Sequence, residues 1–146
     1  MTAYSALLHA HSGFRWLVLL VLAIVLIKSL IGLFGGGEYS RFDKIMATSF
    51  VGFMDLQLLI GLILYFISPI VKEARSVGMG NMMADSTLRF WGMEHLLIMI
   101  LAVAAAHIGS VITKKAEDNI VKFRFQSIFF GVALLLMLIG IPWDRL

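Results

Sequence analysis

The chain has 146 residues, of which 60% are hydrophobic and only 14% are charged, and its formal net charge is +3. Soluble domains carry about 25% charged residues, so this composition excludes an ordinary water-soluble domain. The small net charge gives no indication of nucleic-acid binding. Cysteine is absent, which excludes disulfides, thiolate metal sites and cysteine-bound iron–sulfur clusters. The long apolar segments are therefore candidate membrane spans.

The first two apolar segments are each long enough to cross a hydrocarbon core, which takes about 20 helical residues. The first extends over about 5–34 and precedes glycines 35–37, which favour the end of a helix. It is too long for a signal peptide and lacks a basic leader and a small-residue cleavage motif. The second extends over about 46–68 and stops at Pro69, whose ring cannot continue a helix from the preceding turn.

The stretch from 70 to 85 mixes charged residues with glycine and asparagine, so it predicts a loop with at most one interfacial turn. Asp85 or Ser86 is a suitable N-cap for a third helix over about 86–113. Two lysines directly after this segment indicate the membrane interface. A third span is therefore expected here.

The fourth apolar segment extends over about 124–141 and is followed by Pro142 and Trp143, a pair typical of a membrane boundary. Backbone groups in lipid must be satisfied internally, so all four segments are expected to be helices. Four helices with short links favour one all-α domain over 1–146, an integral membrane up-down-up-down bundle. The lipid bilayer is its first expected partner.

The two faces of this bundle are predicted to carry different numbers of basic residues. Both termini and residues 70–85 share one face, here called the terminal face, and the other two connections lie on the loop face. The positive-inside rule then predicts a multi-pass membrane protein whose loop face is cytoplasmic and whose termini both lie outside. The loop face carries Lys28, Arg41, Lys44, Lys114, Lys115, Lys122 and Arg124, and the terminal face carries Arg15, Lys72, Arg75, Arg89 and Arg145.

Polar residues inside the apolar segments are the functional candidates, because an ionisable group at bilayer depth is costly. The first and third helices both begin at the terminal face, so their polar and aromatic residues converge in one half of the bundle. The converging residues are His11, Arg15, Trp16, Arg89, Trp91, Glu94 and His95, and the other polar residues in the spans are Asp55, Gln57, His107 and Gln126.

Two histidines on different helices suggest a haem site. Neutral imidazoles are the strongest iron ligands in a chain without cysteine, and His11 with His95 would ligate a b-type haem on both axial sides. Arg15 or Arg89 would meet the haem propionates. Counting about 1.5 Å per residue from the expected helix ends places His95 deeper than His11 by roughly 5–10 Å, which a shifted or tilted helix would have to absorb.

The polar residues in the spans also have purely structural alternatives. His95 would then donate a hydrogen bond to Asp55, Gln57 or a backbone carbonyl, and His107 would bond to a neighbouring helix. Asp55, near the middle of the second helix, should be protonated, paired with a histidine or involved in proton movement, because burial disfavours the carboxylate.

Three sequence runs resemble a family of small four-helix membrane proteins of Bacteroidota that are described as cytochrome b-like. The runs are His9-Ala-His-Ser-Gly-Phe-Arg-Trp16, Gln57-Leu-Leu-Ile-Gly-Leu-Ile-Leu-Tyr-Phe-Ile-Ser-Pro69 and Arg89-Phe-Trp-Gly-Met-Glu-His95. The resemblance covers nearly the whole chain and implies haem binding or association with a respiratory chain. It also implies a bacterial inner (plasma) membrane, so the termini are expected in the periplasm. It singles out His11, Arg15, Trp16, Gln57, Arg89, Glu94 and His95.

Two functional hypotheses of different classes follow. The first is a membrane-embedded b-type haem protein that transfers electrons, with quinone as a candidate partner, alone or within a respiratory complex. The second is a cofactor-free accessory or structural subunit of a larger membrane complex or homo-oligomer, whose polar cluster binds lipid or a partner helix. A stand-alone catalyst is not indicated, since no nucleophile, base and orienting group occur together.

Overall fold

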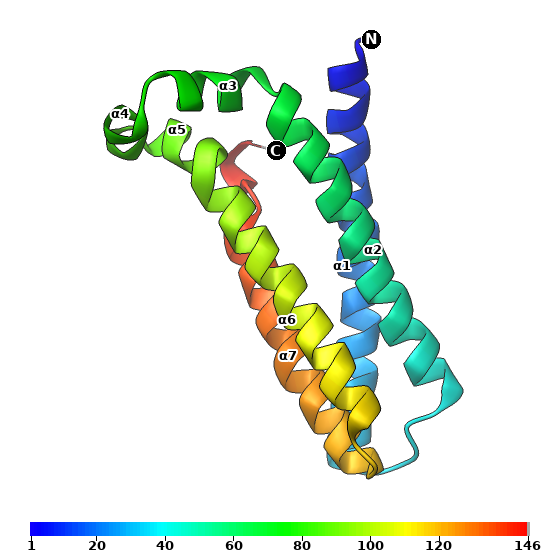
Figure 1. The fold of residues 1–146 in the computed structure, drawn as a ribbon. Coiled ribbons are helices and arrows are strands. Elements are labelled where there is room, and N and C mark those ends of the chain that lie inside the picture. The colour runs from blue at the N-terminus through cyan, green and yellow to red at the C-terminus, as the bar shows by residue number, and fades with distance from the viewer. Residues whose placement is uncertain (146) are drawn as a thin grey trace.

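The computed structural model describes residues 1–145, and this part of the chain consists of helices and short connections. Its long helices are α1 (Ala3–Gly35), α2 (Arg41–Ile67), α6 (His95–Lys115) and α7 (Asn119–Gly140) (Figure 1). With two short segments before it, α6 forms one span over Ser86–Lys115. All four units are long and apolar enough to cross a membrane, which confirms the predicted all-α membrane fold.

The long helices form an up-down-up-down bundle in which each contacts two others. Helix α1 packs against α2 and α7, and α6 packs against α7 and α2, so α1 and α6 lie diagonally across the bundle. Both ends of the described chain and the short helices lie at one end of the bundle (Figure 1). The predicted grouping of the termini with residues 70–85 is therefore confirmed.

The interior of the bundle is packed by apolar side chains, and its outside is apolar as well. The rings of Phe50 and Phe130, both fully buried, lie 4.9 Å apart between their centroids. A Cβ added at Gly109 of α6 would lie 2.5 Å from Phe129 Cβ, so the two backbones approach closely there. Phe34 is 83% exposed and Leu135 is 62% exposed. Such outward side chains fit a surface surrounded by lipid rather than water.

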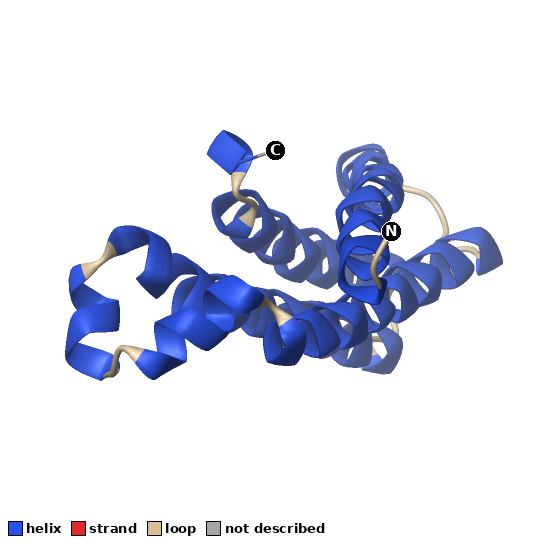
Figure 2. Ribbon diagram, turned by 90° about the horizontal axis from the view of Figure 1, so that it is seen from above, coloured by secondary structure: helices blue, strands red, loops and turns tan. Residues whose placement is uncertain are grey.

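The expected loop over 70–85 is wrong, because most of this stretch is helical. It contains α3 (Pro69–Ser76) and α4 (Met79–Ala84), which lie beside the terminal end of the bundle when viewed from above (Figure 2). Val71 and Ala74 are buried one helical turn apart, so α3 is amphipathic and its apolar face packs inward. A run too short and too polar to cross a membrane can still form a helix on a packed surface.

Helix starts differ from the hydropathy estimates because polar first turns are helical too. Helix α2 begins at Arg41, where Ser40 and Asp43 form a capping box, and α7 begins at Asn119. The predicted cap of the third span is confirmed, since the Asp85 carboxylate accepts hydrogen bonds from two backbone N–H groups of the first turn. Hydropathy measures only the part of a helix that lies in hydrocarbon.

Candidate functional site

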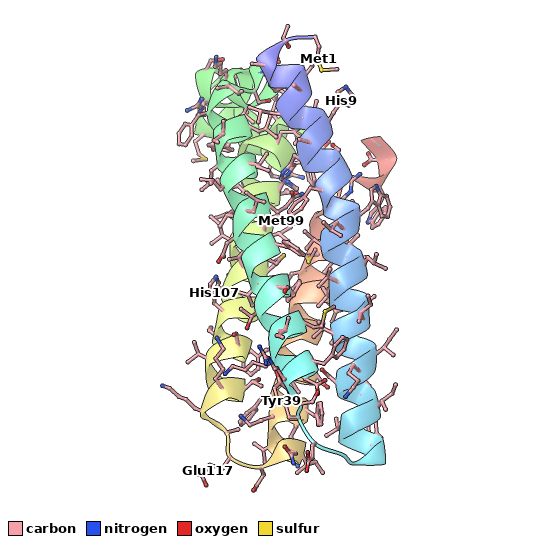
Figure 3. The ribbon with its side chains drawn as sticks, turned by 90° about the vertical axis from the view of Figure 1, so that its right-hand side faces the viewer. Met1, His9, Tyr39, Met99, His107 and Glu117 are labelled. Atoms are coloured by element: carbon pink, nitrogen blue, oxygen red, sulfur yellow. The ribbon has the colours of Figure 1, made fainter. Side chains whose placement is uncertain are left out.

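A cavity of about 400 Å³ lies inside the bundle near its terminal end. All four long helices contribute to its walls, which include Val18, Met54, Val103 and Met137, and Met99, labelled in Figure 3, lies midway along the bundle. Sites for small molecules and cofactors occupy about 300–1,000 Å³ and are mostly apolar with a few polar groups. This cavity matches that description in size and in wall chemistry.

His11 and His95 meet across this cavity. Their ring centroids lie 6.4 Å apart and their planes are 84° apart, although the residues come from diagonally opposed spans. The predicted depth mismatch of roughly 5–10 Å is therefore wrong. Since α1 begins at Ala3 and the third span at Ser86, the two histidines lie almost equally far from the starts of their helices.

The orientation of His95 is set by a backbone carbonyl. Its Nδ1 lies 2.7 Å from the oxygen of Gly140, at the end of α7. A carbonyl oxygen only accepts hydrogen bonds, so Nδ1 carries the proton and the neutral ring keeps a free lone pair on Nε2. Metal-ligating histidines are commonly held in this way, with the other ring nitrogen bonded to a carbonyl or carboxylate. His95 therefore has the backbone carbonyl partner that was one structural alternative, and its Nε2 atom could still bind a metal.

Helix geometry changes directly before His95. The segment η1 (Phe90–Glu94) is a π-helical turn, a feature that often occurs at functional sites. The Trp91 ring lies 5.8 Å from the His95 ring and lines the cavity, in agreement with the predicted cluster. The turn is held by the Tyr65 hydroxyl, which donates to the Gly92 carbonyl at 2.8 Å. Neither this turn nor the role of Tyr65 was predicted from sequence.

Three buried polar atoms of residues that line the cavity have no hydrogen-bond partner among the described residues. They are His11 Nδ1, Arg15 Nε and Gln57 Oε1. The amide nitrogen of Gln57 is satisfied, since it donates to the His11 carbonyl at 2.8 Å. Burying an unpaired polar group in apolar surroundings costs several kcal/mol. If an occupant of the cavity placed polar groups next to these atoms, it would supply the missing hydrogen bonds.

A glycine of α2 makes room for the His11 ring. A Cβ added at Gly61 would lie 3.1 Å from His11 Cε1, closer than nearly all side-chain contacts. The imidazole therefore packs directly against the α2 backbone. Gly61 was not among the predicted site residues, and its signal in the sequence is a glycine in the interior of an apolar helix.

Two predicted site residues lie outside the cavity. The Arg89 side chain binds Glu94 at 2.5 Å and donates to the Met83 carbonyl, so it is engaged on the outer surface. Trp16 is 52% exposed and contacts the ring of Trp143. Sequence proximity to the cluster did not determine which way these side chains point. Among the described lining residues, Arg15 is the one cationic side chain.

The polar pair on the outer surface of the bundle is separate from the cavity. His107 Nε2 lies 2.6 Å from Asp55 Oδ1, and both side chains are about half-exposed. His107 points outward from the bundle in Figure 3. The predicted bond of His107 to a neighbouring helix is confirmed. Of the three alternatives for Asp55, the structure shows the pairing with a histidine.

The side chains that could bind a metal limit which ligands the cavity could hold. Within residues 1–145, no group of three or more histidine, aspartate or glutamate side chains is placed to hold a metal ion. The lining of the cavity contains two imidazoles, those of His11 and His95. Comparison with protein-family models, curated proteins and solved structures finds no match to this chain.

Proposed function

We propose that this protein is a membrane-embedded b-type haem protein that takes part in electron transfer. The supporting observation is the pair of imidazoles across the cavity. Two axial imidazoles at metal–nitrogen distances of about 2.0–2.1 Å have ring centroids about 6 Å apart. The ring centroids of His11 and His95 are separated by 6.4 Å, which is close to this spacing.

The other lining residues have roles in the same proposal. The Gly140 carbonyl holds His95 in the ligating tautomer, and Arg15 presents an N–H group that suits a propionate carboxylate. Apolar side chains from the four helices exclude water from the iron ligands. A bound haem supplies a one-electron redox couple whose potential depends on axial ligands, hydrogen bonds and burial.

The location and partners belong to the same proposal. We place the chain in the bacterial inner membrane as a cytochrome b-like protein, with its loop face in the cytoplasm. Support comes from the basic residues at the ends of the spans, including Arg41, Lys114 and Lys115. Because the cavity lies within membrane helices, the electron partner we propose is a lipid-soluble quinone or a neighbouring membrane subunit.

The test is a reduced-minus-oxidised absorption spectrum of the detergent-purified protein from cells supplied with a haem precursor, with haem measured per chain. We expect a b-type spectrum and one haem per chain. Substituting His11→Ala or His95→Ala should lower the haem content at least tenfold while the protein still inserts and elutes as a folded species, since each removes an iron ligand.

The matched control is His9→Ala, because His9 is exposed and lies only two residues from His11. Its haem content should equal that of the unmodified protein. A full spectrum in His95→Ala would exclude His95 as a ligand. Folded protein that takes up no haem would refute the proposal and favour the cofactor-free accessory subunit.

A further inference from the structure

A second cavity, of about 770 Å³, opens between α2 and α6 at the loop end of the bundle. Tyr39, labelled near this end in Figure 3, is part of its wall. The described residues that line this cavity include no carboxylate. This cavity is here called the basic cavity. The basic residues of its lining are Arg41, Lys44, Lys114 and Lys122.

Hydroxyl groups add hydrogen-bonding capacity between these cations. Thr113 is only 2% exposed, and its Oγ1 has no hydrogen-bond partner among the described residues. This buried hydroxyl would gain a hydrogen bond if an occupant of the cavity reached it. The hydroxyl-bearing residues of the lining are Tyr39, Ser40, Thr48, Ser49, Ser110 and Thr113.

The charge of Lys122 is not neutralised by its neighbours. Its ammonium donates to the Thr113 carbonyl at 3.3 Å and lies 5.5 Å from the centroid of the Tyr39 ring. Burial, with a contribution from the nearby Asp43 carboxylate, raises the pKa of Tyr39 to about 12, so the phenol is uncharged at neutral pH. Asp43 is itself paired with Lys28 at 3.1 Å. The basic cavity therefore keeps its positive charge.

We propose that the basic cavity binds the phosphate headgroup of an anionic phospholipid. Four cations without a carboxylate complement a phosphodiester, and the unpaired Thr113 hydroxyl can donate to a phosphate oxygen. Basic pockets between membrane helices on the cytoplasmic side suit such headgroups. Exposed apolar side chains at this end of the bundle, Ile45 on α2 and Val111 on α6, provide a surface for acyl chains. This proposal does not depend on haem binding.

The test compares lipid binding by the full-length protein in detergent, using native mass spectrometry. Phosphatidylglycerol and phosphatidylcholine with identical acyl chains are titrated separately, and phosphatidylglycerol should be retained preferentially. Lys114→Gln should weaken phosphatidylglycerol binding about fivefold, the effect of one basic residue near a lipid surface. The control is Lys115→Gln, an identical charge change at an exposed residue outside the lining, which should change binding less than twofold.

A charge-neutral variant tests the hydroxyl. Thr113→Val replaces the buried hydroxyl with a methyl group of similar size, so it should weaken phosphatidylglycerol binding about tenfold through one lost hydrogen bond to a charged group. Thermal stability without lipid should be unchanged or higher, because this hydroxyl has no protein partner to lose.

Three results would overturn the proposal. Equal binding of phosphatidylcholine would show that the headgroup charge is not recognised. Equal loss in Lys115→Gln and Lys114→Gln would show a diffuse electrostatic effect rather than a site. Displacement of phosphatidylglycerol by millimolar inorganic phosphate would assign the basic cavity to free phosphate instead.

Discussion

The imidazole of His95 is oriented by the carbonyl of Gly140 and not by another side chain. A Cβ added at Gly140 would clash with Met99 and Ile98, so this position also sets how closely α7 approaches α6. One glycine therefore contributes to helix packing and to the tautomer of the proposed ligand. Both contributions come from the backbone of Gly140: its carbonyl oxygen binds His95, and the absence of a Cβ leaves room for α6.

A second residue-scale feature is the buried phenol of Tyr39, which donates to Gln126 Oε1 at 2.6 Å. Its pKa is raised to about 12, so the folded state holds the proton more tightly than the unfolded state, whose pKa is near 10. Stability from this group is complete below pH 10 and is lost as the pH rises through 12. We expect the free energy of unfolding to fall by about 1–3 kcal/mol across this window.

Tyr39→Phe is the comparison that isolates this effect, because lysines titrate in the same range in both proteins. The variant should lack the tyrosinate absorbance step near pH 12 and should lose less stability between pH 10 and 12. An unchanged absorbance titration in Tyr39→Phe would contradict the assignment.

Between the helices α6 and α7, a close backbone approach occurs at Gly109 of α6. The small residues Ala102, Ala105 and Ala106 of the same helix are buried as well. Polar anchors lie nearer the loop end, where the fully buried Gln126 donates to the Ser29 hydroxyl. Membrane helices associate through close backbone approach and hydrogen bonds across helices, because lipid offers no hydrophobic driving force between them.

Gly109→Ala tests the close approach of α6 and α7. The added methyl would lie 2.5 Å from Phe129 Cβ, so we expect overpacking to destabilise the bundle by about 1–3 kcal/mol. The measurement is unfolding in detergent followed by tryptophan fluorescence. Gly131→Ala is the matched control, since a Cβ there meets no atom within 4 Å. Equal stability of the two variants would show that α6 and α7 can move apart at Gly109 without a loss of stability.

At the scale of the whole molecule, the two ends of the bundle have different chemistry. The terminal end contains an apolar cavity with two imidazoles, and the loop end contains the basic cavity. The packed core around Phe50 and Phe130 lies between the two levels along α2 and α7. A protein with such distinct ends should have one orientation in the membrane.

Cysteine labelling tests that orientation, and the chain has no native cysteine to remove. We expect Ser76→Cys, at the terminal end, to react with an impermeant maleimide on spheroplasts. Glu38→Cys and Glu117→Cys should react only after the membrane is permeabilised, because both connections lie at the loop end. Labelling of residue 38 from outside would reverse the orientation. Residues 38 and 117 on opposite sides would contradict the four-span fold.

The number of spans, their approximate ends and the half of the bundle that contains His11, Arg15 and His95 could be predicted from sequence alone. These properties depend on local signals. Apolar length indicates a span, glycines 35–37 and Pro69 end helices, and Asp85 caps one. The alternation of antiparallel helices then determines which helix ends share a face.

Helix rotation, register and cavity formation could not be predicted in this way, because they depend on how the helices pack. Every face of these helices is apolar, so periodicity does not distinguish the inward side from the lipid-facing side. For this reason Arg15 lines the cavity while Trp16 points outward, and Arg89 is paired with Glu94 instead. The contacts of Gly61 with His11 and of Gly140 with His95 join residues far apart in the chain, and such contacts arise only when the helices pack.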